Sequence, residues 1–267
     1  TDESNEGAVS AYSINEDGSL TFLNRESTGG PGPCHLAVDL TDSYVIAANY
    51  AGGSVCMLPI ERNGALQRKC DFVQHEGSSI NAERQQEAHA HSVTIDRSNS
   101  RAYVCDLGMD KIVVYRIDLE DGRLVEDTDL TVTSKPGHGP RHFDFHPGGK
   151  YCYAINELGS TVAVYDFDPG SGRITEKQVI STLPAGWAGT SHTADIHVSP
   201  DGRFVYGSNR GHDSIAIFSV DPDTGQLDPA GYEPTLGQTP RNFALSPDGR
   251  FLLAENQDTA SIVTFSI

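Results

Sequence analysis

One short unit recurs five times along the chain and constrains the fold more than any other feature. Each copy has two alternating apolar runs joined by a polar turn, such as Pro-Asp-Gly or Pro-Gly-Gly, which is the pattern of a β-hairpin. A register residue in each copy is followed ten residues later by Asn or Asp, so the length of the hairpin is constant. The five pairs are Asp39 and Asn49, Asp96 and Asp106, His146 and Asn156, Ser199 and Asn209, and Ser246 and Asn256.

A second hairpin with a glycine turn follows each of the first four copies, and one strand, "ASIVTFSI", follows the fifth. The register residues are 57, 50, 53 and 47 residues apart, and no segment shows convincing helical periodicity. Four strands in a repeat of this length are typical of a blade of a β-propeller. The rival fold, a two-sheet sandwich, explains neither the constant register nor the fivefold recurrence.

We therefore predict an all-β chain in which residues 1–267 form a single β-propeller domain of four-stranded antiparallel blades. The half-repeat "GAVSAYSINEDGSLTF" supplies two strands, four complete repeats supply sixteen, and the last repeat supplies three. The expected total is 21 strands, or about five and a quarter blades. We accordingly expect a truncated piece of a propeller whose N-terminal blade and a half and last outer strand are missing.

Composition limits the partners of the chain. The net charge is −18, which opposes binding to nucleic acid but permits a small anionic ligand where basic residues cluster. The chain has no apolar run of 18 residues and a polar, acidic N-terminus, so we expect neither a membrane span nor a signal peptide. The five cysteines form no CxxC pair, and Cys105 and Cys152 lie in apolar runs. We expect reduced core thiols and a cytoplasmic protein, and we leave the oligomeric state open.

Polar residues of unlike type stand at one end of the hairpins. The residues in register just before the first strand are Cys34, His91, Arg141, Ala194 and Arg241, and those after the recurring Asn or Asp are Tyr50, Leu107, Glu157, Arg210 and Gln257. A hairpin returns both ends to one edge, so Arg141 should lie beside Glu157 at the mouth of the propeller channel. We expect neighbouring blades to add His91, Arg210 and Arg241.

Arginines bind carboxylate or phosphate through paired hydrogen bonds, and a His or Glu beside them is suited to general acid or base catalysis. Arg141 and Arg241 have an alternative reading as salt bridges between blades, with Glu157 as their passive partner. The recurring Asn or Asp is best read as a cap of the following turn. His89 and His91 lack a third metal ligand, so we expect no metal and no cofactor. The insertion "QHEGSSINAERQQEAHAHS" is either a lid or an ordinary loop.

Several motifs together carry a family resemblance: "TGGPGPCHLAVD", "AANYAGGSV", "RQQEAHAHSV", "DLGMDKI", "GPRHFDFHPGGKYCYAINE" and "SPDGRFVYGSNRGHDSIAIF". With these motifs the chain resembles the lactonase family of seven-bladed β-propellers. That family includes the cycloisomerase-type 6-phosphogluconolactonases and the fungal 3-carboxy-cis,cis-muconate lactonizing enzymes. The resemblance implies seven blades in the intact molecule, no metal, and a site in the channel mouth. It places the proposed catalytic set of the fungal branch on His91, Arg141, Glu157 and Arg210.

On these grounds we expect a lactone hydrolase, most simply a 6-phosphogluconolactonase of the pentose phosphate pathway of carbohydrate metabolism. His91 or Glu157 would activate water, and Arg141 or Arg210 would stabilise the oxyanion. The expected substrate-binding residues are Arg241, His89, His142 and Asn156. One alternative is a carboxy-muconate lactonizing cycloisomerase, and another, of a different class, is a non-catalytic propeller that binds a metabolite or a protein.

Overall fold

The computed structural model describes residues 6–267, and within this range the chain forms strands, turns and irregular segments without a helix. In this described part, no helix exists that could cross a membrane. The chain divides after Pro136 into two compact units, residues 1–136 and residues 137–267. Both units are built from antiparallel sheets alone.

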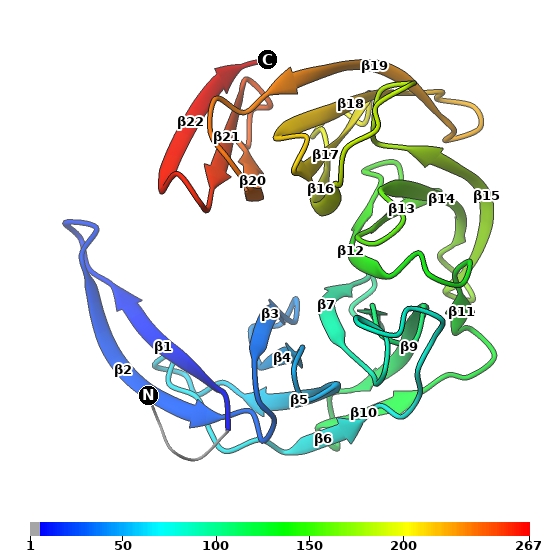
Figure 1. Cartoon of the computed structure of the whole chain (residues 1–267). Helices are drawn as coiled ribbons and strands as arrows, with labels where there is room; N and C mark the ends of the chain where they lie inside the picture. Colours follow the sequence, from blue (N-terminus) through cyan, green and yellow to red (C-terminus); the bar gives the residue numbers. More distant parts are fainter. Residues whose placement is uncertain (1–5) are drawn as a thin grey trace. The chain divides into compact units, whose positions relative to one another are not determined.

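The described residues of unit 1 form three sheets, labelled in Figure 1. The first is a hairpin of β1 (Ala8–Ile14) and β2 (Leu20–Ser27). The second has the strand order β3 (Pro33–Val38), β4 (Tyr44–Asn49), β5 (Ser54–Pro59) and β6 (Asp71–Gln74). The third has the order β7 (Ala90–Ile95), β8 (Arg101–Asp106), β9 (Lys111–Asp118) and β10 (Arg123–Glu126), and β11 (Val132–Thr133) also pairs with β9.

Unit 2 repeats the same arrangement in three further sheets. The first consists of β12 (Pro140–Phe145), β13 (Tyr151–Asn156), β14 (Thr161–Asp168) and β15 (Arg173–Ser181). The second consists of β16 (His192–Val198), β17 (Phe204–Arg210), β18 (Ser214–Val220) and β19 (Leu227–Pro234). The third consists of β20 (Pro240–Leu245), β21 (Phe251–Asn256) and β22 (Ser261–Ser266). In each sheet the strands pair in chain order.

The 21 predicted strands are all present, as one hairpin, four sheets of at least four strands and a final sheet of three. The difference from the prediction is β11, a short second piece of the outer strand that β10 begins. Between the two pieces the amides of Leu130 and Thr131 both donate to the carbonyl oxygen of Asp127, at 3.1 Å. These two bonds form a turn, which interrupts the pairing with β9 and splits the outer strand.

The five repeated hairpins turn in the same way, which explains their constant register. The amide three residues after each register residue donates to the register carbonyl at 2.8–3.0 Å. The donor residue has a φ of 55° to 75°, a left-handed conformation that Gly, Asn and Asp adopt at the lowest cost. The five donors are accordingly all of these types: Asp42, Asn99, Gly149, Gly202 and Gly249.

The first strand of every repeated hairpin contains a β-bulge close to its start. In β12, Pro140 pairs with Asn156 and His142 pairs with Ile155, so Arg141 has no partner of its own. The same irregularity isolates Cys34 in β3, His91 in β7 and Arg241 in β20, and it takes in Ala194 and Asp195 in β16. The expectation that these residues precede the strand is therefore wrong. They lie one or two residues inside it, at a bulge, which redirects a side chain.

The recurring Asn or Asp at the end of the second strand serves the following turn, as predicted. In four hairpins its amide nitrogen lies 3.0–3.4 Å from the hydroxyl of the Ser or Thr five residues later. Asn156, one of these four, has no exposed surface and donates to Thr161, so we assign it to the turn. Asp106 serves its turn in another way, since its Oδ1 accepts from the amide of Met109 in the turn and from the amide of His89.

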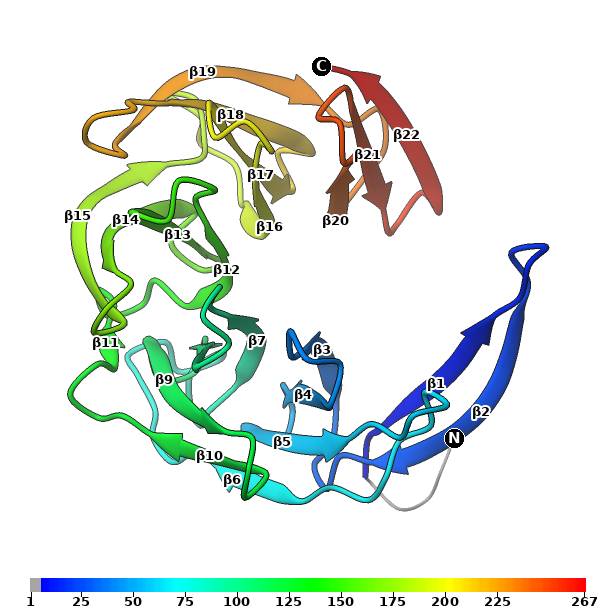
Figure 2. The same ribbon diagram turned by 180° about the vertical axis from the view of Figure 1, so that it is seen from behind.

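Apolar residues fill the spaces between neighbouring sheets within each unit. In unit 2, Tyr153 and Ile155 of β13 pack in one cluster with Val205 of β17 and Phe218 of β18. The first strands of the three sheets, β12, β16 and β20, lie next to one another, and their succession can be followed from behind in Figure 2. This packing brings the bulges of unit 2 close together.

The cysteines differ in burial. Cys56, Cys105 and Cys152 are buried, and burial raises the pKa of Cys56 and Cys105 to about 12. The predicted core position of Cys105 and Cys152 is confirmed, whereas Cys34 and Cys70 are exposed. All five lie in the described residues, and no disulfide joins any of them.

Candidate active site

Two arginines and one glutamate form a buried ion cluster in unit 2. Glu157 follows β13 directly, and its amide donates to the carbonyl of Gly139, just before the bulge of β12. Its Oε2 lies 2.9 Å from Nε of Arg141 and 2.9 Å from Nη2 of Arg210. The structure therefore brings together three of the four residues predicted to be catalytic, on the predicted hairpin and its neighbour.

The burial of the three residues differs. The side chains of Arg141 and Glu157 are 3% and 4% exposed, whereas that of Arg210 is 14% exposed. Arg210 ends β17, and its Nη2 also donates to the carbonyl of Thr193 at 2.8 Å. Gly211 follows with a φ of +103°, and a Cβ there would lie 2.3 Å from the oxygen of Thr190. A glycine after Arg210 thus lets the chain pass close to its neighbour while the guanidinium stays in place.

The cluster carries one more positive charge than negative charge, since two guanidiniums share one carboxylate. Burial lowers the pKa of Arg141 to about 10, which Glu157 opposes, so the group stays charged at neutral pH. A buried carboxylate between two guanidiniums is stabilised by both, and each guanidinium is held in a fixed direction. Such an arrangement is suited to binding a further negative charge.

A second buried network adjoins this cluster. Nη1 of Arg141 lies 3.1 Å from Nε2 of His142, and Nδ1 of His142 lies 2.7 Å from Oδ1 of Asp195. Burial and the charge of Arg141 lower the pKa of His142. Burial opposes ionisation of Asp195, but its bonds to His142 and His197 outweigh it and hold the pKa of Asp195 well below the usual value. His142 therefore contacts Arg141, a catalytic candidate, and its predicted contact with substrate stays a prediction.

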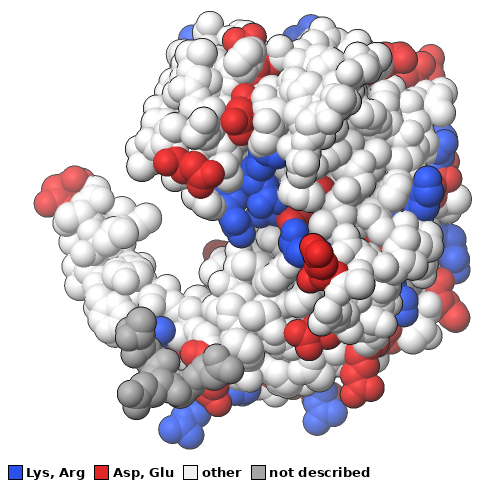
Figure 3. All heavy atoms as spheres, in the orientation of Figure 1, with Lys and Arg blue, Asp and Glu red and all other residues white. Residues whose placement is uncertain are grey.

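Arg241, predicted to bind substrate, is exposed at the bulge of β20. Its Nη1 lies 3.3 Å from Oε1 of Gln257, the residue after the recurring Asn of the same hairpin. Its charge also lowers the pKa of the Arg141 side chain, a smaller effect than that of burial. Figure 3 shows Lys and Arg atoms gathered beside β16 and β20, on a protein that is acidic as a whole.

The histidines of "HAHS" lie in unit 1, beside an aromatic residue and a thiol. The ring of His89 stacks on Tyr50 with centroids 4.5 Å apart, and the ring of His91 meets Tyr50 edge-on at 5.3 Å. Sγ of Cys34 lies 3.9 Å from Nδ1 of His91. His91 itself is buried, at the bulge of β7. Its convergence with the three residues of unit 2 stays a prediction.

The insertion before β7 is an anchored loop. Gln85 has no exposed surface, and its Nε2 donates to the carbonyl of Leu107 at 2.8 Å. Ser79 donates to Asp110 at 2.5 Å. These contacts hold the loop against unit 1, so they favour the reading as an ordinary loop over that as a lid. The loop places Nη2 of Arg84 at 3.0 Å from the hydroxyl of Tyr50.

Sequence reasoning missed three residues, one beside the arginine cluster of unit 2 and two beside the histidines of unit 1. Asp195 stands in the same register as His142, so its position in the repeat carried a signal. Tyr50 follows the recurring Asn, as Glu157 does, and carried the same signal. Arg84 lies in the insertion, outside the repeat, and nothing in the pattern distinguished it. Among the described residues, no group of three His, Cys, Asp or Glu side chains is arranged to hold a metal ion.

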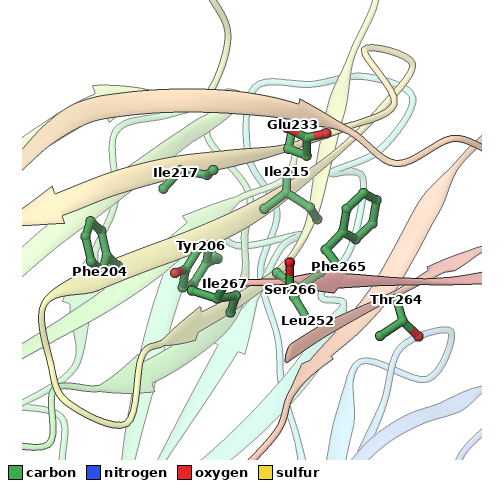
Figure 4. A pocket seen from close by; sticks show the side chains of 10 residues that line it. All are labelled: Phe204, Tyr206, Ile215, Ile217, Glu233, Leu252, Thr264, Phe265, Ser266 and Ile267. Atoms are coloured by element: carbon green, nitrogen blue, oxygen red, sulfur yellow. The ribbon is translucent and has the colours of Figure 1, made fainter. Parts of the chain in front are cut away.

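A cavity of about 620 Å³ lies elsewhere in unit 2, between β17 and β18 on one side and β21 and β22 on the other. Its walls are mainly apolar, with Phe204, Ile215, Leu252 and Phe265 among them, and Glu233 is the one charged side chain that lines it (Figure 4). It contains none of the predicted site residues. A lone carboxylate at an apolar wall cannot bind an anion, so we place the candidate site at the arginine cluster.

The bulged four-stranded sheets with charged residues at their first strands define a class of protein. Over residues 1–267 the chain matches the family described as lactonase, seven-bladed β-propeller, and it belongs to that family. The predicted family and the predicted propeller fold are thereby confirmed.

Particular relatives are similar over most of the chain. A 6-phosphogluconolactonase of Bacillus subtilis is 40% identical over 89% of this chain and 67% of its own length. A 6-phosphogluconolactonase of Formosa agariphila is 36% identical over 90% of this chain and 68% of its own length. Among solved structures, a periplasmic gluconolactonase of Pseudomonas aeruginosa has a TM-score of 0.92 and 32% identity, and the match covers 98% of this chain and 73% of that one.

Proposed function

We propose that this protein is a lactone hydrolase that opens 6-phosphogluconolactone to 6-phosphogluconate. The observation that carries the proposal is the 40% identity to a 6-phosphogluconolactonase over 89% of the chain. The cationic cluster of Arg141, Glu157 and Arg210 supports it, because both the phosphate of the substrate and the oxyanion formed in the reaction are negative. The reaction belongs to the pentose phosphate pathway of carbohydrate metabolism.

Lactone hydrolysis needs no redox step. A water oxygen bonds to the carbonyl carbon, the carbonyl oxygen becomes an oxyanion, and the ring C–O bond then breaks. The proton that a base takes from water is finally delivered to the departing ring oxygen. We expect a small anionic lactone as partner and no metal, and the cytoplasmic location stays a prediction.

We infer different tasks for the members of the cluster from their burial. Arg210 is the most exposed of the three, so we assign it the contact with the oxyanion or the phosphate. The Oε2 of Glu157 is shared by two guanidiniums, so we assign this carboxylate to holding the arginines. The role of base then falls to His91, and exposed Arg241 is suited to a distal charge on the substrate.

A second candidate substrate is gluconolactone without the phosphate. The similarity to the Pseudomonas aeruginosa gluconolactonase, with a TM-score of 0.92, favours it. The test is to measure hydrolysis of fresh 6-phosphogluconolactone and of gluconolactone under the same conditions, corrected for spontaneous opening. We expect the phosphorylated lactone to have the higher kcat/KM. Equal or lower values for it would favour the second candidate, and no hydrolysis of either would overturn the proposal.

A further inference from the structure

Arg141 and the next residue, His142, contact each other through their side chains, which is unusual for consecutive residues of a strand. Successive side chains in a strand point to opposite faces of the sheet. The bulge between Pro140 and His142 removes this alternation, and Nη1 of Arg141 comes within 3.1 Å of Nε2 of His142. The bulge therefore allows the contact, and the contact holds one edge of the guanidinium.

The direction of this hydrogen bond determines which ring nitrogen of His142 carries the proton. A guanidinium has only donors, so Nε2 of His142 must accept and must carry no proton. The proton of the neutral ring is then on Nδ1, from which it donates to Oδ1 of Asp195 at 2.7 Å. The lowered pKa of His142, which burial and Arg141 cause, agrees with a neutral ring.

Asp195 is itself fixed from two strands. Its Oδ2 accepts from Nδ2 of Asn242 at 2.8 Å and from the amide of Phe243 at 3.2 Å, both in β20. Nε2 of His197, in the same strand as Asp195, lies 3.1 Å from the same oxygen. Asp195 is 2% exposed, so its carboxylate is held on all sides by protein. A continuous series of contacts thus runs from β20 through Asp195 and His142 to Arg141.

We propose that Asp195 and His142 are positioning residues for the arginine cluster. Asp195 holds the proton of His142 on Nδ1, His142 then accepts from Arg141, and Arg141 pairs with the carboxylate of Glu157 that also holds Arg210. Nη1 of Arg141 is further fixed by the carbonyl of Ala194, at 2.5 Å. The result is a guanidinium at Arg210 that meets the charge of the substrate without reorganisation. The inference rests on the proposed function and adds residues that act on substrate only through others.

The test is a pair of substitutions, each of which keeps one of the two side-chain contacts of His142. In His142→Gln, the amide oxygen takes the approximate place of Nε2 and accepts from Arg141. In His142→Asn, the amide nitrogen takes the approximate place of Nδ1 and donates to Asp195, while the contact with Arg141 is lost. We expect kcat to fall about 10- to 10²-fold in His142→Asn, the loss that a displacement of about 1 Å causes, and less than about threefold in His142→Gln.

The matched control is His197→Asn, because His197 contacts Asp195 but not Arg141. We expect this variant to have a lower melting temperature and an unchanged kcat. If Asp195 and His142 only join the sheets, the variants should lose stability and keep their kcat. That outcome, or a larger loss of kcat in His142→Gln than in His142→Asn, overturns the proposal.

A measurement without turnover separates this inference from the proposed function. Nitrogen-15 NMR of the full chain should show His142 as the neutral ring with its proton on Nδ1, and Asp195→Asn should change that signal. A wild-type signal with the proton on Nε2 would overturn the inference even if the lactone is hydrolysed. Conversely, an inactive wild type with the expected signal would overturn the function and leave the contact series in place.

Discussion

The blades built from β7–β10 in unit 1 and from β12–β15 in unit 2 use one backbone for two different chemistries. Both place a polar residue at the bulge of the first strand, His91 in one and Arg141 in the other. In unit 1 the neighbours of His91 are an aromatic ring and a thiol. In unit 2 the neighbours of Arg141 are a carboxylate and an imidazole.

The comparison shows which part of a blade is constrained. The turn and the recurring Asn or Asp are held by hydrogen bonds that every blade needs, so they vary little. The side chains of the bulged residue and of the residue after the Asn or Asp make no such hydrogen bond in every blade, so the residue type at these positions varies between blades. Departures from the repeat therefore mark the positions that are available for function. We expect His91 in unit 1 and the arginine cluster in unit 2 to respond differently to substitution.

The largest effect on the rate of hydrolysis is expected from substitution of His91. His91→Asn removes the proposed base, and we expect the rate of lactone hydrolysis to fall about 10²- to 10⁴-fold with little change in KM. His89→Asn is the matched variant two residues earlier, for which we expect a raised KM instead. Steady-state kinetics on the two variants checks the prediction. Equal effects on kcat would remove the distinction between the two histidines.

In the arginine cluster of unit 2, Glu157→Gln leaves the guanidiniums of Arg141 and Arg210 without their carboxylate. We expect the free energy of unfolding to fall by about 3–5 kcal/mol, the cost of breaking a buried ion pair. Asp201→Asn is the control, because the pair of Asp201 and Arg203 is well exposed and should contribute less than about 1 kcal/mol. Urea denaturation of both variants measures the difference. Similar small losses would show that the buried cluster is not held by its charges.

A smaller effect is expected from Arg84, the cation that unit 1 presents on its anchored loop. Arg84→Met keeps the aliphatic part and removes the guanidinium beside the hydroxyl of Tyr50. We expect KM for the phosphorylated lactone to rise about tenfold, or about 1.4 kcal/mol, with kcat unchanged. Arg62→Met, at an exposed position of the same unit, is the control. An unchanged KM would show that Arg84 does not bind the substrate, and only His89 and His91 would remain as proposed site residues of unit 1.

The sequence was sufficient for the fold because the repeat encodes it locally. The left-handed turn position takes only Gly, Asn or Asp, and this pattern is visible without coordinates. The pairing of Arg141 with Glu157 followed from the hairpin as well, since its two ends must meet. The split of the outer strand into β10 and β11 was not visible, because a turn of two hydrogen bonds leaves no periodic signal.

The candidate site could be predicted only in part. The bulge that carries Arg141 was missed, since a bulge changes pairing without changing composition. The contact of Arg141 with His142 was missed for the same reason, because alternation places consecutive side chains on opposite faces. Arg84 was missed because its loop lies outside the repeat, and its contact with Tyr50 joins residues 34 positions apart in the chain.

The central claim is that the cationic cluster of unit 2 acts on a negatively charged lactone through Arg210. The most direct measurement is kcat and KM of Arg210→Met on 6-phosphogluconolactone, beside a melting curve, with Arg203→Met as the exposed control. We predict a fall of about 10²- to 10³-fold in kcat for Arg210→Met, as for removal of an oxyanion donor, and unchanged kinetics for the control. Unchanged kcat and KM in Arg210→Met, with only a lowered melting temperature, would contradict the account and leave the cluster structural.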